Sequence, residues 1–298
     1  MKPMSRLALV VTLAGLLSTG ISTSSMDARH QDVTQMPTLA ELQKMTARFA
    51  PADIGADLSA LPKNERDALA KLIDASRIMD ALFLRQAWAG NDAMLQDLAA
   101  RAARPVGPRA SRSAAIRLHY FLINKGPWDR LDDNRPFVPS APAKPEGANF
   151  YPAGATKADV QKWLDGLSGA AKEAATGFFT TIRRGDKGFI AVPYSVEYQG
   201  ELARAADLLR EAAALTSNAT LKKFLTARAD AFLTNDYYAS DVAWMELDAA
   251  IEPTIGPYEV YEDEWFNAKA AFEAFITVRD EAESTKLQWY FIKTSMLP

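Results

Sequence analysis

Apolar residues recur at helical spacing through most of this chain, and this periodicity constrains the fold more than any other feature. Glu201 to Leu215 is the clearest case, since its leucines share one face and its charged residues share the other. A second such segment between residues 62 and 89 ends at the helix breaker Gly90. Thr38 with Glu41 forms a capping box, and the TKAD sequence from Thr156 is a similar helix start. The sequence predicts a helical domain over residues 37–252.

The pattern changes after Pro253. Apolar residues then alternate with largely polar ones such as Lys269, Glu273 and Thr277, and the apolar positions are Ala270, Phe272, Ala274, Ile276 and Val278. Period two is typical of a half-buried strand, although a helix over residues 268–275 stays an alternative because alanine is common there. We expect a mainly α protein with a small β element (α+β): a multi-helix body followed by strands near residues 254–280. Residues 253–280 would begin a β-containing lobe that binds substrate.

Two internal segments lack helical periodicity. Residues 125–154 are rich in Pro, Gly and Asn, yet they contain the aromatic residues Trp128, Phe137, Phe150 and Tyr151. Because such residues are unusual in flexible linkers, we expect an ordered loop. Residues 188–195 indicate a short strand or an extended loop.

The first residues have the pattern of a secretory signal peptide. Lys2 and Arg6 precede the apolar run Leu7–Leu17, and small residues follow at Ser18, Gly20 and Ser22. A short buried helix is the alternative reading. We therefore expect a signal peptide over residues 1–22, a disordered leader over 23–36, a periplasmic or secreted location, and no membrane association after cleavage. Residues 281–298 are expected to form an atypical C-terminal tail.

The composition excludes several kinds of chemistry. The chain has no cysteine and only two histidines, His30 and His119, which excludes disulfides, thiolate metal sites, a cysteine nucleophile and any motif that needs a pair of nearby histidines. His119 lies in an apolar helical run, where we expect a hydrogen-bonded core residue rather than a ligand. The net charge of −3 argues against nucleic-acid binding.

The sequence contains two clusters of charged residues, and both are expected to be solvated surface. We expect the five arginines near residues 101–117 to form a solvated surface that pairs with carboxylates, with an anion site as the second interpretation. The carboxylates Glu259, Glu262, Asp263 and Glu264 do not match a calcium loop, so a solvated turn is expected.

Glu259 and Tyr261 form an E-x-Y pair. If residues 258–261 form a strand, the two side chains project from the same face. A carboxylate beside a phenol could bind a substrate ammonium and donate a hydrogen bond to an oxyanion. On spacing alone, a cross-strand polar pair on an exposed face is the favoured interpretation, because E-x-Y is common by chance.

The segment Ile255–Asp263 (IGPYEVYED), followed by Lys269–Phe275 (KAAFEAF), resembles the dipeptidyl peptidase III family of zinc metallopeptidases, and most of all its shorter exported bacterial members. Val192–Ser195 and Ala231–Leu247 resemble the same family. The resemblance implies two lobes around a wide cleft and release of dipeptides from the N-termini of oligopeptides. It gives Glu259 the role of holding the free amino terminus of the substrate and Tyr261 the catalytic role of oxyanion stabiliser.

The family's zinc motif H-E-x-x-G-H, which lies well downstream of E-x-Y, has no counterpart in this sequence. We therefore expect a truncated substrate-binding half that is inactive alone, with no metal ligand and no cofactor in this chain, although the full-length family uses zinc. The expected partners are oligopeptide N-termini, together with oligomers or aggregates formed through exposed lobe surface such as the edge of the last strand. The alternative is a non-enzymatic exported helical binding or scaffold protein.

Overall fold

A computed structural model describes residues 36–104 and 108–286. The predicted signal peptide and nearly all of the predicted leader lie outside these residues, as do residues 287–298 of the predicted tail. The described residues from Met36 onward belong to one compact unit. The division between a helical domain over 37–252 and a β-containing lobe over 253–280 stays a prediction.

The described part of the chain is mostly helical and carries small antiparallel sheets, which confirms the predicted fold class. Its longer helices are α1 (Leu39–Thr46), α2 (Lys63–Ala87), α3 (Asn91–Ala103), α4 (Pro108–Asn124), α5 (Lys157–Asp165), α6 (Gly169–Thr176), α8 (Gln199–Leu215), α9 (Ala219–Thr234) and α10 (Tyr238–Met245). Short helical turns form η1 (Ala148–Phe150) and α7 (Tyr194–Glu197). The strands are β1 (Trp128–Asp129), β2 (Arg135–Pro136), β3 (Thr180–Gly185), β4 (Gly188–Pro193), β5 (Ile251–Glu259) and β6 (Ala271–Val278).

Two helix starts follow directly from the sequence. Thr38 and Thr156 each accept a hydrogen bond from the backbone N–H three residues later, and Glu41 and Asp159 accept one in return. Both capping boxes are therefore confirmed, because each satisfies backbone donors that the first turn of a helix cannot satisfy internally.

The strands form three antiparallel pairs: β1 with β2, β3 with β4, and β5 with β6. Residues 271–278 form a strand, which decides against the helical alternative for this segment. Strand β3 was not predicted, because its sequence TTIRRG buries only its first three residues and shows no apolar alternation. Residues 188–193 form β4, and the chain then turns into α7.

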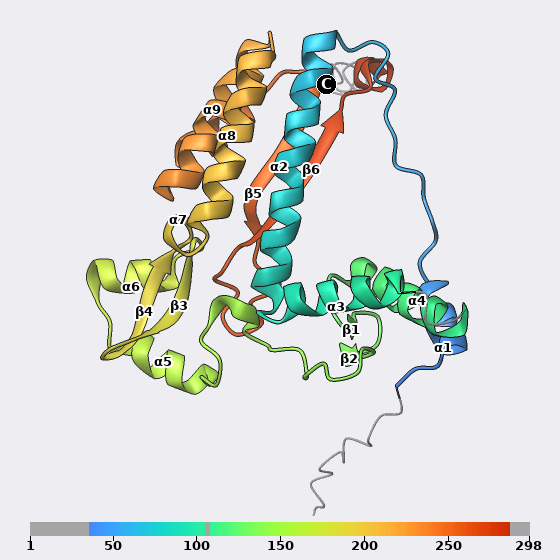
Figure 1. The fold of residues 1–298 in the computed structure, drawn as a ribbon. Helices are drawn as coiled ribbons and strands as arrows, with labels where there is room; N and C mark the ends of the chain where they lie inside the picture. Colours follow the sequence, from blue (N-terminus) through green and yellow to red (C-terminus); the bar gives the residue numbers. More distant parts are fainter. Residues whose placement is uncertain (1–35, 105–107, 287–298) are drawn as a thin grey trace, which may run out of the picture. The chain divides into compact units, whose positions relative to one another are not determined.

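The β5–β6 ribbon packs against α2 and α9 (Figure 1). Pairing of Pro257 with Phe272 and of Ile255 with Ala274 places these residues on the face toward the core. Phe272 is fully buried, and the rings nearest to it are those of Tyr194, Tyr198 and Phe232, with centroids 5.5, 5.8 and 6.3 Å away. The other face of the ribbon is more open: Phe275 is 60% exposed.

A glutamine of α2 binds the start of β6. Gln86 is fully buried, its Nε2 donates to the carbonyl of Ala270, and its Oε1 accepts the backbone N–H of Phe272 at 2.8 Å. Part of the strand edge is therefore hydrogen-bonded inside the described part of the chain. Association through the remaining edge and the open face stays a proposal, which size-exclusion chromatography would test.

Lys269 is buried, against its expected place among outward polar residues, because it precedes β6 rather than belonging to it. Its Nζ donates to the carbonyls of Ala175 and Gly177 and to Oγ1 of Thr180, at 2.7 to 2.8 Å. Three acceptors match the three N–H bonds of an ammonium. Lys269 thereby attaches the start of β6 to the turn between α6 and β3.

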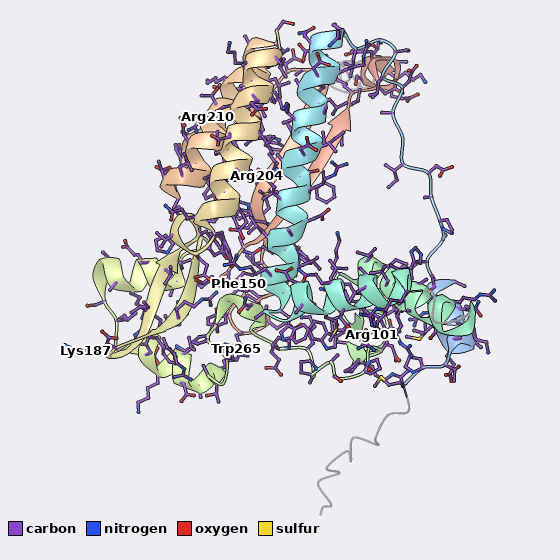
Figure 2. The ribbon with its side chains drawn as sticks, viewed as in Figure 1. Arg101, Phe150, Lys187, Arg204, Arg210 and Trp265 are labelled. Atoms are coloured by element: carbon purple, nitrogen blue, oxygen red, sulfur yellow. The ribbon has the colours of Figure 1, made fainter. Side chains whose placement is uncertain are left out.

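The segment 125–154 is ordered, as expected. Trp128, Phe137, Phe150 and Tyr151 are all at most 5% exposed. Phe150 and Trp265 belong to the same apolar cluster, and Figure 2 shows them in one region of the structure. None of the helices in the described ranges combines the length and apolar character that a bilayer crossing requires.

The free energy of unfolding is expected to rise modestly from pH 8 to about 10 and then to fall. Burial lowers the pKa of Lys269 to about 8, so the folded state releases this proton before the unfolded state does, and stability increases with pH in that range. Burial raises the pKa of Tyr120 to about 12 and also raises the pKa values of Tyr194, Tyr198 and Tyr237. Unfolded tyrosines lose their protons near pH 10, so stability falls above that pH.

Urea titrations between pH 7 and pH 11.5 measure this profile. Lys269→Met should remove the rise and keep the fall. A free energy of unfolding that stays constant from pH 10 to 11.5 would contradict the assignment to buried tyrosines.

Candidate functional site

The E-x-Y motif lies at the end of the β5–β6 ribbon. Strand β5 ends at Glu259, and Tyr261 lies in the turn that follows, with 75% of its surface exposed. The expected strand over 258–261 is thus interrupted, and the alternation argument for a shared face applies only up to Glu259. Neither side chain has a hydrogen bond or ion pair with another residue of the described ranges, so both are available to a ligand.

A second carboxylate lies beside Glu259 and was missed by the sequence analysis. Glu259 pairs with Ala271 across the ribbon, and Glu273 follows two residues later on the same face of β6. Burial, and then the negative charge of Glu259, raises the pKa of Glu273. The only sequence signal for Glu273 was the alternation of polar and apolar residues along β6, which placed it on the polar face. The pair makes this end of the ribbon favourable for a cation.

Two of the four clustered carboxylates, Glu262 and Asp263, are buried, contrary to the expected solvated turn, whereas Glu259 and Glu264 are exposed. Asp263 is fully buried: its Oδ1 accepts the backbone N–H groups of Trp265 and Phe266, while its Oδ2 accepts the N–H of Ala268 and the hydroxyl of Tyr151, both at 2.9 Å. These bonds fold the chain between the two strands into a compact loop. Asp263 therefore has a structural role.

The neighbours of Asp263 are paired with the ordered loop 125–154. Glu262 is 7% exposed, and its Oε1 lies 2.6 Å from Nη1 of Arg130. Nζ of Lys144 lies 2.6 Å from Oε1 of Glu264. These ion pairs fix the turn that carries Tyr261 to a segment more than a hundred residues earlier in the chain.

His119 is exposed, whereas we expected it in the core. Helix α4 turns Tyr120 and Phe121 inward instead, and His119 lines a surface groove formed by α1, the segment after it with Phe49, and α4 with Ile116. Only one face of α4 packs against the core. His119 precedes Tyr120 in the chain and lies off that face, so its side chain points outward.

The arginine cluster is partly paired as expected. Nε of Arg101 lies 2.8 Å from Oδ2 of Asp97. Arg117 instead donates to the carbonyls of Pro37 and Phe137 and to Oγ of Ser113, so it holds three segments together rather than pairing with a carboxylate. The side chain of Arg109 lies outside the described residues.

Comparison with known proteins gives these residues a family context. Residues 173–295 match the model of peptidase family M49. The structure of dipeptidyl peptidase III from Corallococcus sp. strain EGB is similar, with a TM-score of 0.80 and 61% identity over 86% of this chain and 46% of that one. Residues 173–295 are thus similar to peptidase family M49, and the fold is similar to that of dipeptidyl peptidase III.

Two further proteins extend this comparison. The structure of DPP III from Caldithrix abyssi has a TM-score of 0.76 and 46% identity over 83% of this chain and 46% of that one. Nudix hydrolase 3 of Arabidopsis thaliana is 35% identical over 84% of this chain and 38% of its own length. The chain therefore spans less than half the length of these relatives.

The M49 family is zinc-dependent, so the described residues can be tested for a zinc site. A zinc ion in a catalytic site needs about three protein ligands that converge. Across residues 36–104 and 108–286 no group of three or more His, Cys, Asp or Glu could hold a metal. The residues that the structure describes do not fit the zinc of M49 peptidases, and we assign them no step that involves the metal.

Proposed function

We propose that this chain is the substrate-binding half of a dipeptidyl peptidase III-type protein that acts on oligopeptide N-termini. The observation that carries this proposal is the 61% identity and TM-score of 0.80 with a dipeptidyl peptidase III over 86% of the chain. At that identity the E-x-Y loop and the ribbon that carries it are expected to keep the same task.

In this proposal Glu259 binds the free amino terminus of the peptide. Its carboxylate is exposed at the end of β5 and has no cationic partner in the described part of the chain. An ammonium would form a charge-assisted hydrogen bond with it. The pKa of Glu273 beside it is raised first by burial and then by the negative charge of Glu259.

Tyr261 supplies the second contact. Its phenol is exposed in the turn two residues after Glu259, where it can donate a hydrogen bond to a peptide carbonyl oxygen. Such a donor gains strength when the oxygen becomes an oxyanion during hydrolysis. The hydrolysis itself needs zinc ligands, and with two histidines and no cysteine we propose that this chain alone binds peptides without cleaving them.

Calorimetry with a tetrapeptide and its N-acetylated form tests this function. We expect the free peptide to bind and acetylation to weaken binding at least tenfold, because it removes the charge that Glu259 recognises. Glu259→Gln should lower the affinity for the free peptide by about tenfold, which is equivalent to about 1.4 kcal/mol of binding free energy. Tyr261→Phe should have a smaller effect on a ground-state ligand.

Glu264→Gln provides the matched control, since that carboxylate pairs with Lys144 and lies outside the proposed site. Equal affinity for both peptides, or an unchanged affinity in Glu259→Gln, would contradict the proposal. No binding of either peptide would favour the alternative of a non-enzymatic helical scaffold.

A further inference from the structure

A buried arginine lies beneath the end of β5. Arg228 belongs to α9, and its side chain is 1% exposed. Its Cζ lies 5.5 Å from the ring centroid of Phe224, 5.3 Å from that of Tyr237 and 5.4 Å from that of Tyr258. Three aromatic rings thus surround one guanidinium, an arrangement that favours a planar cation.

The hydrogen bonding of this guanidinium is incomplete. Its Nη2 donates to Oδ1 of Asp241 on α10 at 2.6 Å, and Asp241 itself is half exposed. Nε and Nη1 are buried and have no hydrogen-bond partner among the described residues. Buried donors without partners are costly, and an apolar side chain of similar size would avoid that cost. Stability alone does not explain an arginine at this position.

The guanidinium also contacts β5, the strand that leads into the E-x-Y motif. Gly256 has a φ of +150°, and a Cβ at that residue would lie 2.8 Å from Nη1 of Arg228. The register of the ribbon then becomes irregular between Pro257 and Glu259. Arg228 therefore meets β5 at two points, at Gly256 and at the ring of Tyr258, directly before Glu259.

We infer that Arg228 is a positioning residue for Glu259. By filling the space that Gly256 leaves open and by stacking on Tyr258, it fixes the irregular end of β5 and so the direction of the Glu259 carboxylate. The ion pair with Asp241 keeps the guanidinium in place from the side of α10. The role of Glu259 in this inference rests on the proposed function. The contact between Arg228 and the strand does not depend on it.

The test compares Arg228→Lys with Leu221→Ala in the full chain. Lysine keeps the charge but loses the planar group that contacts both Gly256 and Tyr258. Leu221 lies on the same helix, about two turns before Arg228, and is fully buried, so its truncation lowers stability while keeping the contacts of Arg228 with Gly256 and Tyr258. Hydrogen exchange of residues 256–261 and the affinity for a free-amine tetrapeptide are measured for both variants.

We expect Arg228→Lys to speed exchange in residues 256–261 and to weaken peptide binding about fivefold to tenfold, which corresponds to about 1 to 1.4 kcal/mol. Leu221→Ala should lower the melting temperature and change neither local readout. The inference would be overturned if Arg228→Lys kept the exchange rates and the peptide affinity of the wild type. It would also be overturned if Leu221→Ala changed both quantities as much as Arg228→Lys does. If the wild type binds no peptide, the proposed function fails, and the exchange of residues 256–261 alone decides whether Arg228 positions the strand.

Discussion

Replacing Asp263 with alanine is expected to lower the free energy of unfolding by about 3 to 5 kcal/mol, because three backbone N–H groups and one tyrosine hydroxyl lose their acceptor inside the protein. Asp263 is fully buried, so water does not reach these donors without local opening. In a protein of this size, the midpoint of thermal unfolding should fall by about 10 °C. Differential scanning calorimetry gives the value directly.

Glu264→Ala is the matched control, since the neighbouring carboxylate is about two-fifths exposed and forms one ion pair. Its loss should cost less than about 1 kcal/mol. Asp263→Asn should fall between the two, because an amide keeps one acceptor oxygen. If Asp263→Ala unfolds at the wild-type temperature, the loop between β5 and β6 does not depend on these four bonds.

Replacing Phe272 with alanine is expected to cost about 3 to 5 kcal/mol, the range for truncating a buried aromatic side chain. Phe272 fills the space between the ribbon and the rings of Tyr194, Tyr198 and Phe232. Its removal leaves a cavity at the point where β6, α7, α8 and α9 meet. Urea denaturation followed by circular dichroism measures the loss.

The same strand offers an internal control for this substitution. Phe275 lies on the opposite face of β6 and is 60% exposed, so Phe275→Ala makes the same chemical change without a cavity. We expect a cost below about 0.5 kcal/mol. Similar losses in the two variants would show that the ribbon is covered on both faces in solution.

Helices and their starts could be predicted well because their signals are local. A capping box such as Thr38–Glu41 needs only four residues, and the apolar face of α8 needs only seventeen. Strand β3 was missed for the opposite reason: it is held by its pairing with β4 and by the attachment of Lys269, neither of which leaves a pattern in its own six residues. The β6 pattern was readable because only one of its faces packs on the core.

The surroundings of the candidate site depended on contacts that no local pattern contains. Glu259 and Tyr261 received their roles from the family resemblance, whereas spacing alone favoured an exposed polar pair. The burial of Asp263 depends on Tyr151, the pairing of Glu262 depends on Arg130, and the aromatic enclosure of Arg228 depends on Tyr258. Each partner lies 30 or more residues away, so one sequence without its fold could not reveal these groups as structural.

The contact between Gln86 and the Phe272 backbone joins residues 186 positions apart. While a ribosome builds the chain, helix α2 leaves the exit tunnel long before the strand that completes its core face. At about 5 to 20 residues per second, that face stays uncovered for about 10 to 40 s. The part of α2 that faces β6 therefore cannot be covered by its native partner until synthesis has passed residue 272.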